Sequence, residues 1–294
     1  MTLWNNYYIA QDVQGALQAL STSPGSARLI AGGTDLLLDL QQGRHPPLDT
    51  LIDITAIPEM TCLEIRQGEL YIGAALPLNR ILASPLVYQH APALAEACGL
   101  IGGPQVRNSA TLGGNVAHAL PAADGAISLV AQGAEAEVAD LAGRRRIPVE
   151  DLFAGPGKST LDSRRELLLG FWLPLRLAGQ ASAFRRVMRP QGVAIAILNM
   201  AVWVERGEAQ IVDVRLAVGP AGPRPLRARQ AEAALRGCCL DDRTLDLARQ
   251  ALLAEARFRT SPHRATSEYR RHLAGTLLGE TLTAAWKRTY GTER

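Results

Sequence analysis

Two glycine pairs, Gly32-Gly33 and Gly113-Gly114, constrain the fold of this chain more than any other feature of its sequence. The first pair directly follows Arg28–Ala31, which is predicted to be a short strand, and a helix is predicted to begin at Thr34. Glycine reaches backbone conformations closed to other residues and lets the chain approach a ligand without a Cβ in the way. A strand, a glycine turn and a helix in this order predict a compact βα unit whose N–H groups can bind an anion.

The second glycine pair is flanked by the polar residues Thr111 and Asn115. Each pair alone is also compatible with an ordinary turn, but two such segments with polar neighbours fit a diphosphate held from two sides. Thr34 and Thr111 supply hydroxyl donors for such a group. Neither segment extends to GxGxxG or to GxxxxGK[ST], so the common nucleotide motifs are absent. The segment 155–159, Gly-Pro-Gly-Lys-Ser, is interpreted as a turn.

The pattern along the chain predicts an α+β protein of more than one folded unit. Short strands and helices alternate up to a buried strand at 166–173, and a boundary is expected near 175–180. An antiparallel sheet at 183–218 and helices at 228–236, 242–256 and 266–286 are expected after it. The predicted domains are therefore 1–175, with subdomains of roughly 1–55 and 56–175, and 180–294.

Composition excludes several classes of function. The formal net charge of +3 over 294 residues gives no reason to expect a nucleic-acid or membrane partner, and neither a secretory signal nor an apolar spanning segment is evident. A cytoplasmic location is expected. The four cysteines form no CxxC pair and the five histidines are dispersed, so no iron–sulfur or metal site is predicted on this chain. No catalytic triad is evident, and no catalytic residue is predicted.

Several motifs resemble those of one flavoprotein family. The segments 29–36 (LIAGGTDL) and 103–115 (GPQVRNSATLGGN) resemble the two FAD-binding segments of the xanthine dehydrogenase and carbon monoxide dehydrogenase flavoproteins. The match continues at 121–124 (PAAD), 155–158 (GPGK), 166–169 (ELLL) and 264–270 (RATSEYR). The resemblance spans nearly the whole chain and is closest to the separate FAD subunit of bacterial xanthine dehydrogenases.

This resemblance implies a fold and a function. The expected fold is a two-subdomain FAD-binding domain of the vanillyl-alcohol-oxidase-like type, followed by a C-terminal α+β flavoprotein domain. The expected partners are a molybdenum-cofactor subunit and a small subunit with two [2Fe–2S] clusters, assembled as a dimer of heterotrimers. The FAD would receive electrons from the clusters and pass them to NAD or another acceptor, with purine oxidation on the molybdenum subunit. The alternatives are a stand-alone FAD oxidoreductase of the wider fold family and a non-catalytic scaffold, which the intact glycine segments disfavour.

The resemblance also implies which residues bind FAD. Two groups are expected to hold the pyrophosphate, namely Arg28, Leu29, Ile30, Ala31, Gly32, Gly33, Thr34 and Asp35 on one side and Thr111, Gly113, Gly114 and Asn115 on the other. Asp124 is expected to bind cofactor hydroxyls, or alternatively to be a helix N-cap.

The flavin ring and its surroundings would be contacted by residues further along the chain. Ile101 would pack on a cofactor ring, and Leu168 would line the flavin pocket or simply the core. Arg185 would place a cation near the flavin, or else be a solvated charge on a strand. Gly192 stands where relatives commonly carry Asp. Arg264 and Arg270 are expected to anchor the last helix, with a partner contact as the alternative.

Overall fold

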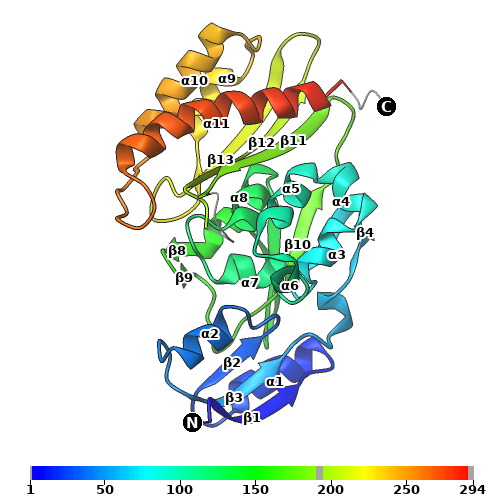
Figure 1. Cartoon of the computed structure of the whole chain (residues 1–294). Helices are drawn as coiled ribbons and strands as arrows, with labels where there is room; N and C mark the ends of the chain where they lie inside the picture. The colour runs from blue at the N-terminus through cyan, green and yellow to red at the C-terminus, as the bar shows by residue number, and fades with distance from the viewer. Residues whose placement is uncertain (1, 190–194, 291–294) are drawn as a thin grey trace.

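A parallel sheet of three strands forms the N-terminal end of the protein (Figure 1). The computed structural model describes residues 2–189 and 195–290. The sheet has the order β1 (Trp4–Ile9), β3 (Leu48–Asp53), β2 (Ala27–Ile30). Helix α1 (Val13–Thr22) joins the first two strands in the sequence, and helix α2 (Leu36–Gln41) follows β2. The predicted βα unit around the first glycine pair is therefore present.

Helix α1 shows how local sequence sets this part of the fold. The sequence predicts that Asp12 is the N-cap of a helix whose apolar side chains follow it at helical spacing. The Asp12 carboxylate accepts a hydrogen bond from the backbone N–H of Gly15 at 2.6 Å, which confirms this prediction. The apolar side chains recur at helical spacing and are buried on one face; they are Val13, Ala16, Leu17 and Leu20. This face packs against the core and fixes the helix on the sheet.

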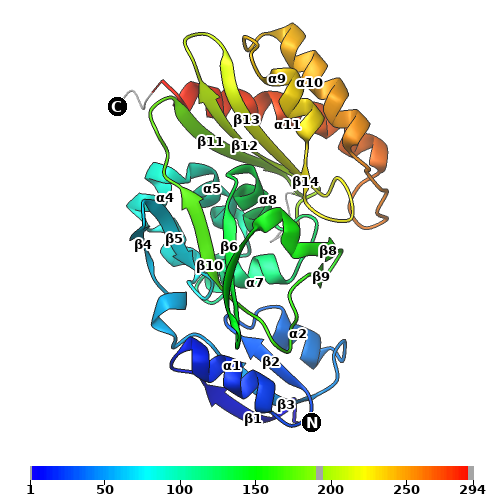
Figure 2. The ribbon, with the colours of Figure 1, turned by 180° about the vertical axis from the view of Figure 1, so that it is seen from behind.

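The middle of the protein contains an antiparallel sheet of five strands surrounded by short helices (Figure 2). Its order is β4 (Leu63–Arg66), β5 (Glu69–Gly73), β10 (Leu167–Pro174), β6 (Glu135–Asp140) and β7 (Gly143–Pro148). The helices are α3 (Leu78–Leu82), α4 (Pro85–His90), α5 (Pro92–Leu100), α6 (Pro104–Arg107), α7 (Leu112–Ala117) and α8 (Asp124–Ala131), with short 3-10 turns at Pro58–Met60 and Val149–Leu152. A hairpin of β8 (Phe153–Gly155) and β9 (Lys158–Ser159) confirms the predicted turn there.

The C-terminal part is an antiparallel sheet of four strands with three helices on one face. The strands lie in the order β11 (Gln180–Val187), β12 (Leu198–Arg206), β13 (Ile211–Gly219) and β14 (Leu226–Arg227). The helices are α9 (Arg229–Leu235), α10 (Asp242–Glu255) and α11 (Ser267–Arg288). Helix α11 packs on β11 and β12, whereas α5 and α8 contact the same sheet from below in Figure 1. The predicted α+β class is confirmed.

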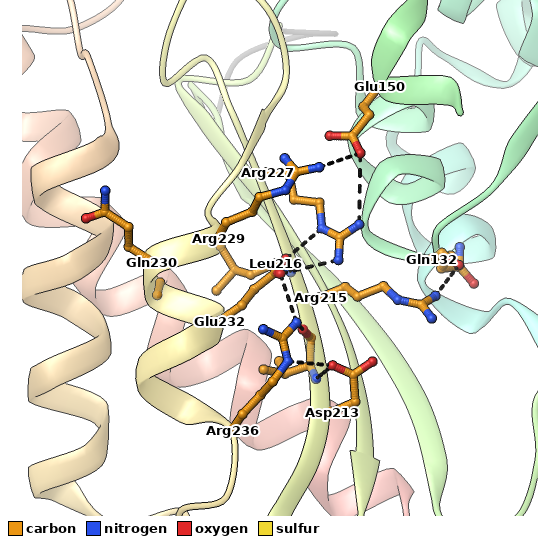
Figure 3. Close-up of polar contacts among 12 residues, drawn as sticks. Gln132, Glu150, Asp213, Arg215, Leu216, Arg227, Arg229, Gln230, Glu232 and Arg236 are labelled. Atoms are coloured by element: carbon orange, nitrogen blue, oxygen red, sulfur yellow. Dashed lines mark hydrogen bonds and ion pairs between the residues drawn. The ribbon is translucent and has the colours of Figure 1, made fainter. Parts of the chain in front are cut away.

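A network of charged residues joins the C-terminal part to the middle part (Figure 3). Glu150 accepts a hydrogen bond from Arg229 at 2.7 Å, and Arg215 donates to the carbonyl oxygen of Gln132 at 3.0 Å. On the sheet side, the fully buried Glu232 pairs with Arg227 at 2.8 Å. These contacts fix the position of the C-terminal part relative to the middle part. Both parts contribute walls to the cavity described below.

No helix in residues 2–189 and 195–290 is long and apolar enough to span a membrane.

Candidate functional site

A cavity of about 1160 Å³ lies where all three parts of the protein meet. Its walls come from the turn between β2 and α2, the starts of α7 and α8, strand β11, and the loop between α10 and α11. The volume is slightly above the usual range for small-molecule sites, which is about 300–1,000 Å³. The cavity therefore has room for a large, extended ligand.

The first glycine pair shapes one wall of this cavity. Gly33 has a φ of +66°, a conformation that L-residues with a side chain rarely adopt. Gly32 lies directly against the other glycine segment, because a Cβ built on it would be only 2.0 Å from the carbonyl oxygen of Ser109. The chain around the two glycine pairs is therefore in backbone contact, and a side chain at position 32 would separate them.

The sequence predicts a loop at the second glycine pair, and this prediction is wrong, because the pair lies in the first turn of helix α7. Thr111 is the N-cap, and its hydroxyl oxygen accepts a hydrogen bond from the N–H of Gly114 at 3.0 Å. Gly113 is buried: its N–H donates to the carbonyl oxygen of Ala74 at 2.9 Å, and a Cβ on it would lie 2.6 Å from that residue. The capping threonine thus begins the helix, and only Gly114 of the pair lines the cavity.

A buried ion pair lies at the start of α8. Asp124 is 5% exposed and accepts hydrogen bonds from the guanidinium of Arg186 and the side-chain amide of Asn199. Burial raises the pKa of the Asp124 carboxyl above its usual range, and the adjacent Arg186 charge and the hydrogen bond from Asn199 oppose that effect. The N-cap of α8 is Ala123, so the alternative interpretation of Asp124 as the N-cap is wrong.

Two family models together cover almost the whole chain. The model described as "FAD binding domain in molybdopterin dehydrogenase" matches residues 3–176, and the "CO dehydrogenase flavoprotein C-terminal domain" matches residues 182–285. The chain belongs to the FAD-binding subunits of the xanthine dehydrogenase and carbon monoxide dehydrogenase family. This confirms the resemblance found in the sequence, and with it FAD as the cofactor of this chain.

The relatives of this FAD-binding subunit are named for several different enzymes. The xanthine dehydrogenase FAD-binding subunit of Escherichia coli O157:H7 is 30% identical over 95% of each chain. The nicotine 6-hydroxylase medium subunit of Paenarthrobacter nicotinovorans is 32% identical over 96% of this chain and 98% of its own. A structure of carbon monoxide dehydrogenase from Hydrogenophaga pseudoflava superposes with a TM-score of 0.91 at 31% identity, covering 96% of this chain and 97% of that one.

The cavity of this flavoprotein fits a diphosphate-containing cofactor. The buried Oδ1 atom of Asn115 has no hydrogen-bond partner among the described residues, so a ligand donor in the cavity would satisfy it. The backbone at Gly32, Gly33 and Gly114 presents no side chain to the cavity. The hydroxyl hydrogen of Thr111 remains available, because its oxygen is the acceptor in the helix cap.

Most residues that the sequence singled out lie in the cavity wall. These are Arg28, Leu29, Ile30, Ala31, Gly32, Gly33, Thr34, Asp35, Ile101, Thr111, Gly114, Asn115 and Asp124. Gly113 and Leu168 do not line the cavity and are buried in the core, the latter on β10 and 7% exposed. Gly192 lies outside the described residues.

The structure brings Arg186, rather than Arg185, into the cavity wall. Arg185 pairs with Glu96 at 3.2 Å and belongs to a cluster between α5 and the end of α11. Successive side chains of a strand point to opposite faces, so the two neighbouring arginines of β11 are separated by the sheet. The sequence alone offered no way to choose between them, because the partner that identifies Arg186 is Asp124, 62 positions away.

Sequence reasoning also missed a group of arginines in the C-terminal part of this cavity. They lie on or next to the loop between α10 and α11 and are Arg257, Arg259, Arg264 and Arg270. Arg264 and Arg270, which are expected to anchor the last helix or to contact a partner, both line the cavity. His118 was not missed: its position just after the second glycine segment predicts that it lies near the cofactor, and it lines the cavity at the end of α7.

Proposed function

We propose that this FAD-binding chain is the electron-transfer subunit of a molybdenum hydroxylase. It would take electrons from [2Fe–2S] clusters of a small partner subunit and pass them to NAD or another acceptor. The observation that carries the proposal is the backbone contact between the two glycine segments in the wall of one cavity, in a chain that belongs to the flavoprotein family. The redox chemistry is supplied by FAD, so the protein needs no acid–base residues of its own.

The residues of this chain would bind and orient the cofactor. The N–H groups of Gly32 and Gly33 and the hydroxyl of Thr111 suit phosphate oxygens, since each is a donor without a bulky side chain in front of it, whereas the N–H of Gly114 already donates to the Thr111 hydroxyl oxygen. Ile101 offers an apolar surface to a ring, and Asn115 offers a free acceptor. These assignments support a cofactor held from both glycine segments at once.

We assign the role of the flavin-facing cation to Arg186. Its side chain is 5% exposed and paired with Asp124, so its charge is fixed in a site largely screened from water. A fixed cation there would favour negative charge on the cofactor, and the effect is larger than at the surface because the local dielectric is lower. Arg185 is less suited to that role, because it does not line the cavity and lies on the other face of β11, where it pairs with Glu96 at 3.2 Å.

The more specific parts of the proposal concern the substrate, the assembly, the cellular location and the domain boundaries. Purine oxidation on a molybdenum subunit is supported by the relative named for xanthine dehydrogenase, although other relatives are named for nicotine and carbon monoxide. A dimer of heterotrimers and a cytoplasmic location belong to the same proposal. We further propose domains 1–175 (subdomains 1–55 and 56–175) and 180–294; the two family models, which match residues 3–176 and 182–285, support the division between the two domains.

Affinity purification of the tagged chain from its native cells tests the proposal. The expected result is a complex with bound FAD, molybdenum and about four iron atoms per flavin, the content of two [2Fe–2S] clusters. Reduction of the flavin by xanthine, but not by nicotine or carbon monoxide, would support the purine assignment. A chain that holds FAD and turns over a substrate without any metal-bearing partner would instead establish a stand-alone oxidoreductase.

A further inference from the structure

Four arginines near the C-terminal loop give the FAD cavity an excess of positive charge. Arg257, Arg259, Arg264 and Arg270 all line it. Within residues 2–189 and 195–290, no carboxylate lies within 4.0 Å of any of the four. Two of the three aspartates in the cavity wall already have partners, since Asp39 pairs with Arg44 and Asp124 with Arg186. The arginine cluster therefore lacks a counter-charge in the described protein.

The loop that carries these arginines is ordered by its own hydrogen bonds. The N–H of Ser261 donates to the carbonyl oxygen of Ala265 at 2.9 Å, which closes a tight turn that contains Arg264 and directly follows Arg259 and Thr260. The N–H of Arg257 donates to the carbonyl oxygen of Ala221 at 2.7 Å and connects the loop to the segment between β13 and β14. The guanidinium groups are thus presented from a fixed backbone, which lowers the entropic cost of binding a ligand.

Arg270 is the buried member of the arginine cluster, and its guanidinium lacks a hydrogen-bond partner at Nε among the described residues. It is 2% exposed, lies in the first turns of α11 and faces the cavity. Burial lowers the pKa of Arg270, and repulsion from Arg259 and Arg264 lowers it further. A buried guanidinium beside two like charges is unfavourable unless an anion compensates it.

We propose that this arginine cluster is a binding site for the phosphate group of a second, dissociable ligand next to the FAD. The inference rests on the proposed function, because it assumes that FAD occupies the glycine segments. Guanidinium groups match phosphate oxygens in paired hydrogen bonds, which favours phosphate over a simple halide. Arg257, Arg259 and Arg264 are exposed, so they can draw an anion from solvent, while buried Arg270 holds it. A phosphate-bearing electron acceptor and free phosphate are the two sources of this chemistry.

Calorimetric titration of the FAD-loaded chain at constant ionic strength tests the site, with inorganic phosphate and ADP as probes. Arg259→Ala and Arg264→Ala should each weaken binding about tenfold, as expected for one charged hydrogen-bonding partner. Arg243→Ala is the matched control, because it removes an exposed arginine of the same part of the chain that does not line the cavity. Tighter binding of ADP would identify a nucleotide ligand, and equal binding would identify free phosphate.

Arg270→Met separates a binding role from the anchoring role. If Arg270 binds an anion, its unpaired charge destabilises the anion-free protein. The substitution should then raise Tm in phosphate-free buffer and abolish the rise in Tm that phosphate causes in the wild-type protein. A lower Tm without phosphate would mean that Arg270 anchors α11, and would overturn the proposal.

Two other results would overturn the site. The first is the absence of binding of either probe to the FAD-loaded chain. The second is loss of FAD from Arg259→Ala and Arg264→Ala, because the arginines would then belong to the cofactor site. A wild-type chain that cannot bind FAD at all would instead refute the proposed function, so the two failures are distinguishable.

Discussion

Replacing Gly32 by alanine tests whether the contact between the two glycine segments creates the FAD site. The new methyl group would lie 2.0 Å from the carbonyl oxygen of Ser109 and 2.9 Å from the Cα of Ala110. The φ of Gly32 lies outside the range that favours glycine, so alanine meets no strain in its own backbone. The whole effect of the substitution therefore comes from the close approach.

The magnitude follows from how far the segments must separate. Non-bonded heavy atoms prefer separations of about 3.5 Å, so the chain at Gly32 and at Ser109 must move apart by roughly 1.5 Å. Both are backbone positions and cannot avoid the clash by a change of rotamer. Overpacking of this kind costs about 1–3 kcal/mol in stability. A displacement of this size also takes phosphate donors beyond hydrogen-bond range, which should weaken FAD binding about 10- to 100-fold.

The assay is FAD affinity from flavin fluorescence, together with the flavin-to-protein ratio and Tm of the purified variant. Gly279→Ala is the matched control: it lies in α11, and a Cβ there meets no atom within 4 Å. It should leave FAD affinity unchanged and raise stability slightly, by up to about 1 kcal/mol. If Gly32→Ala binds FAD as tightly as the wild-type protein does, the two-segment site is refuted.

Asp124→Asn should lower the free energy of unfolding by about 3–5 kcal/mol, because it leaves buried Arg186 without its counter-charge; a loss below 1 kcal/mol in urea denaturation would contradict this. Burial opposes ionisation of Glu96, but hydrogen bonds from Arg288 and a backbone N–H hold its pKa below the ordinary 4.5. Its stabilising effect is therefore complete above that value and lost as pH falls through the lower folded pKa, so Tm of Glu96→Gln should be reduced at neutral pH and converge with wild type in acid. A constant difference would refute the linkage. Asp12→Ala should cost about 1 kcal/mol through loss of the α1 cap, measured as a lower urea midpoint.

Local signals in the sequence were sufficient for much of the fold. The cap at Asp12 and the apolar face behind it predicted α1, and the strand leading into Gly32 predicted the first unit of the site. These features depend on residues a few positions apart, where helix and strand periodicity operate. The same holds for the antiparallel sheet and the three C-terminal helices.

The parts that the sequence did not predict depend on distant partners. Whether Gly113 and Gly114 form a loop or a helix is decided by the Thr111 cap and by contact with Ala74, which belongs to another segment. The choice of Arg186 depends on Asp124 across the sheet. The C-terminal arginines reach the cavity only because α11 packs on the last sheet, a tertiary arrangement without a local sequence pattern.

The arginine-bearing loop also sets the order in which the site is completed during synthesis. The two glycine segments lie in the first 115 residues, whereas the wall formed by residues 257–270 leaves the ribosome more than 140 residues later. At about 5–20 residues per second, this separation corresponds to an interval of roughly 7–30 s. During that interval the nascent chain has only the wall of the cavity that the two glycine segments form. The complete cavity forms once the C-terminal sheet and α11 have docked.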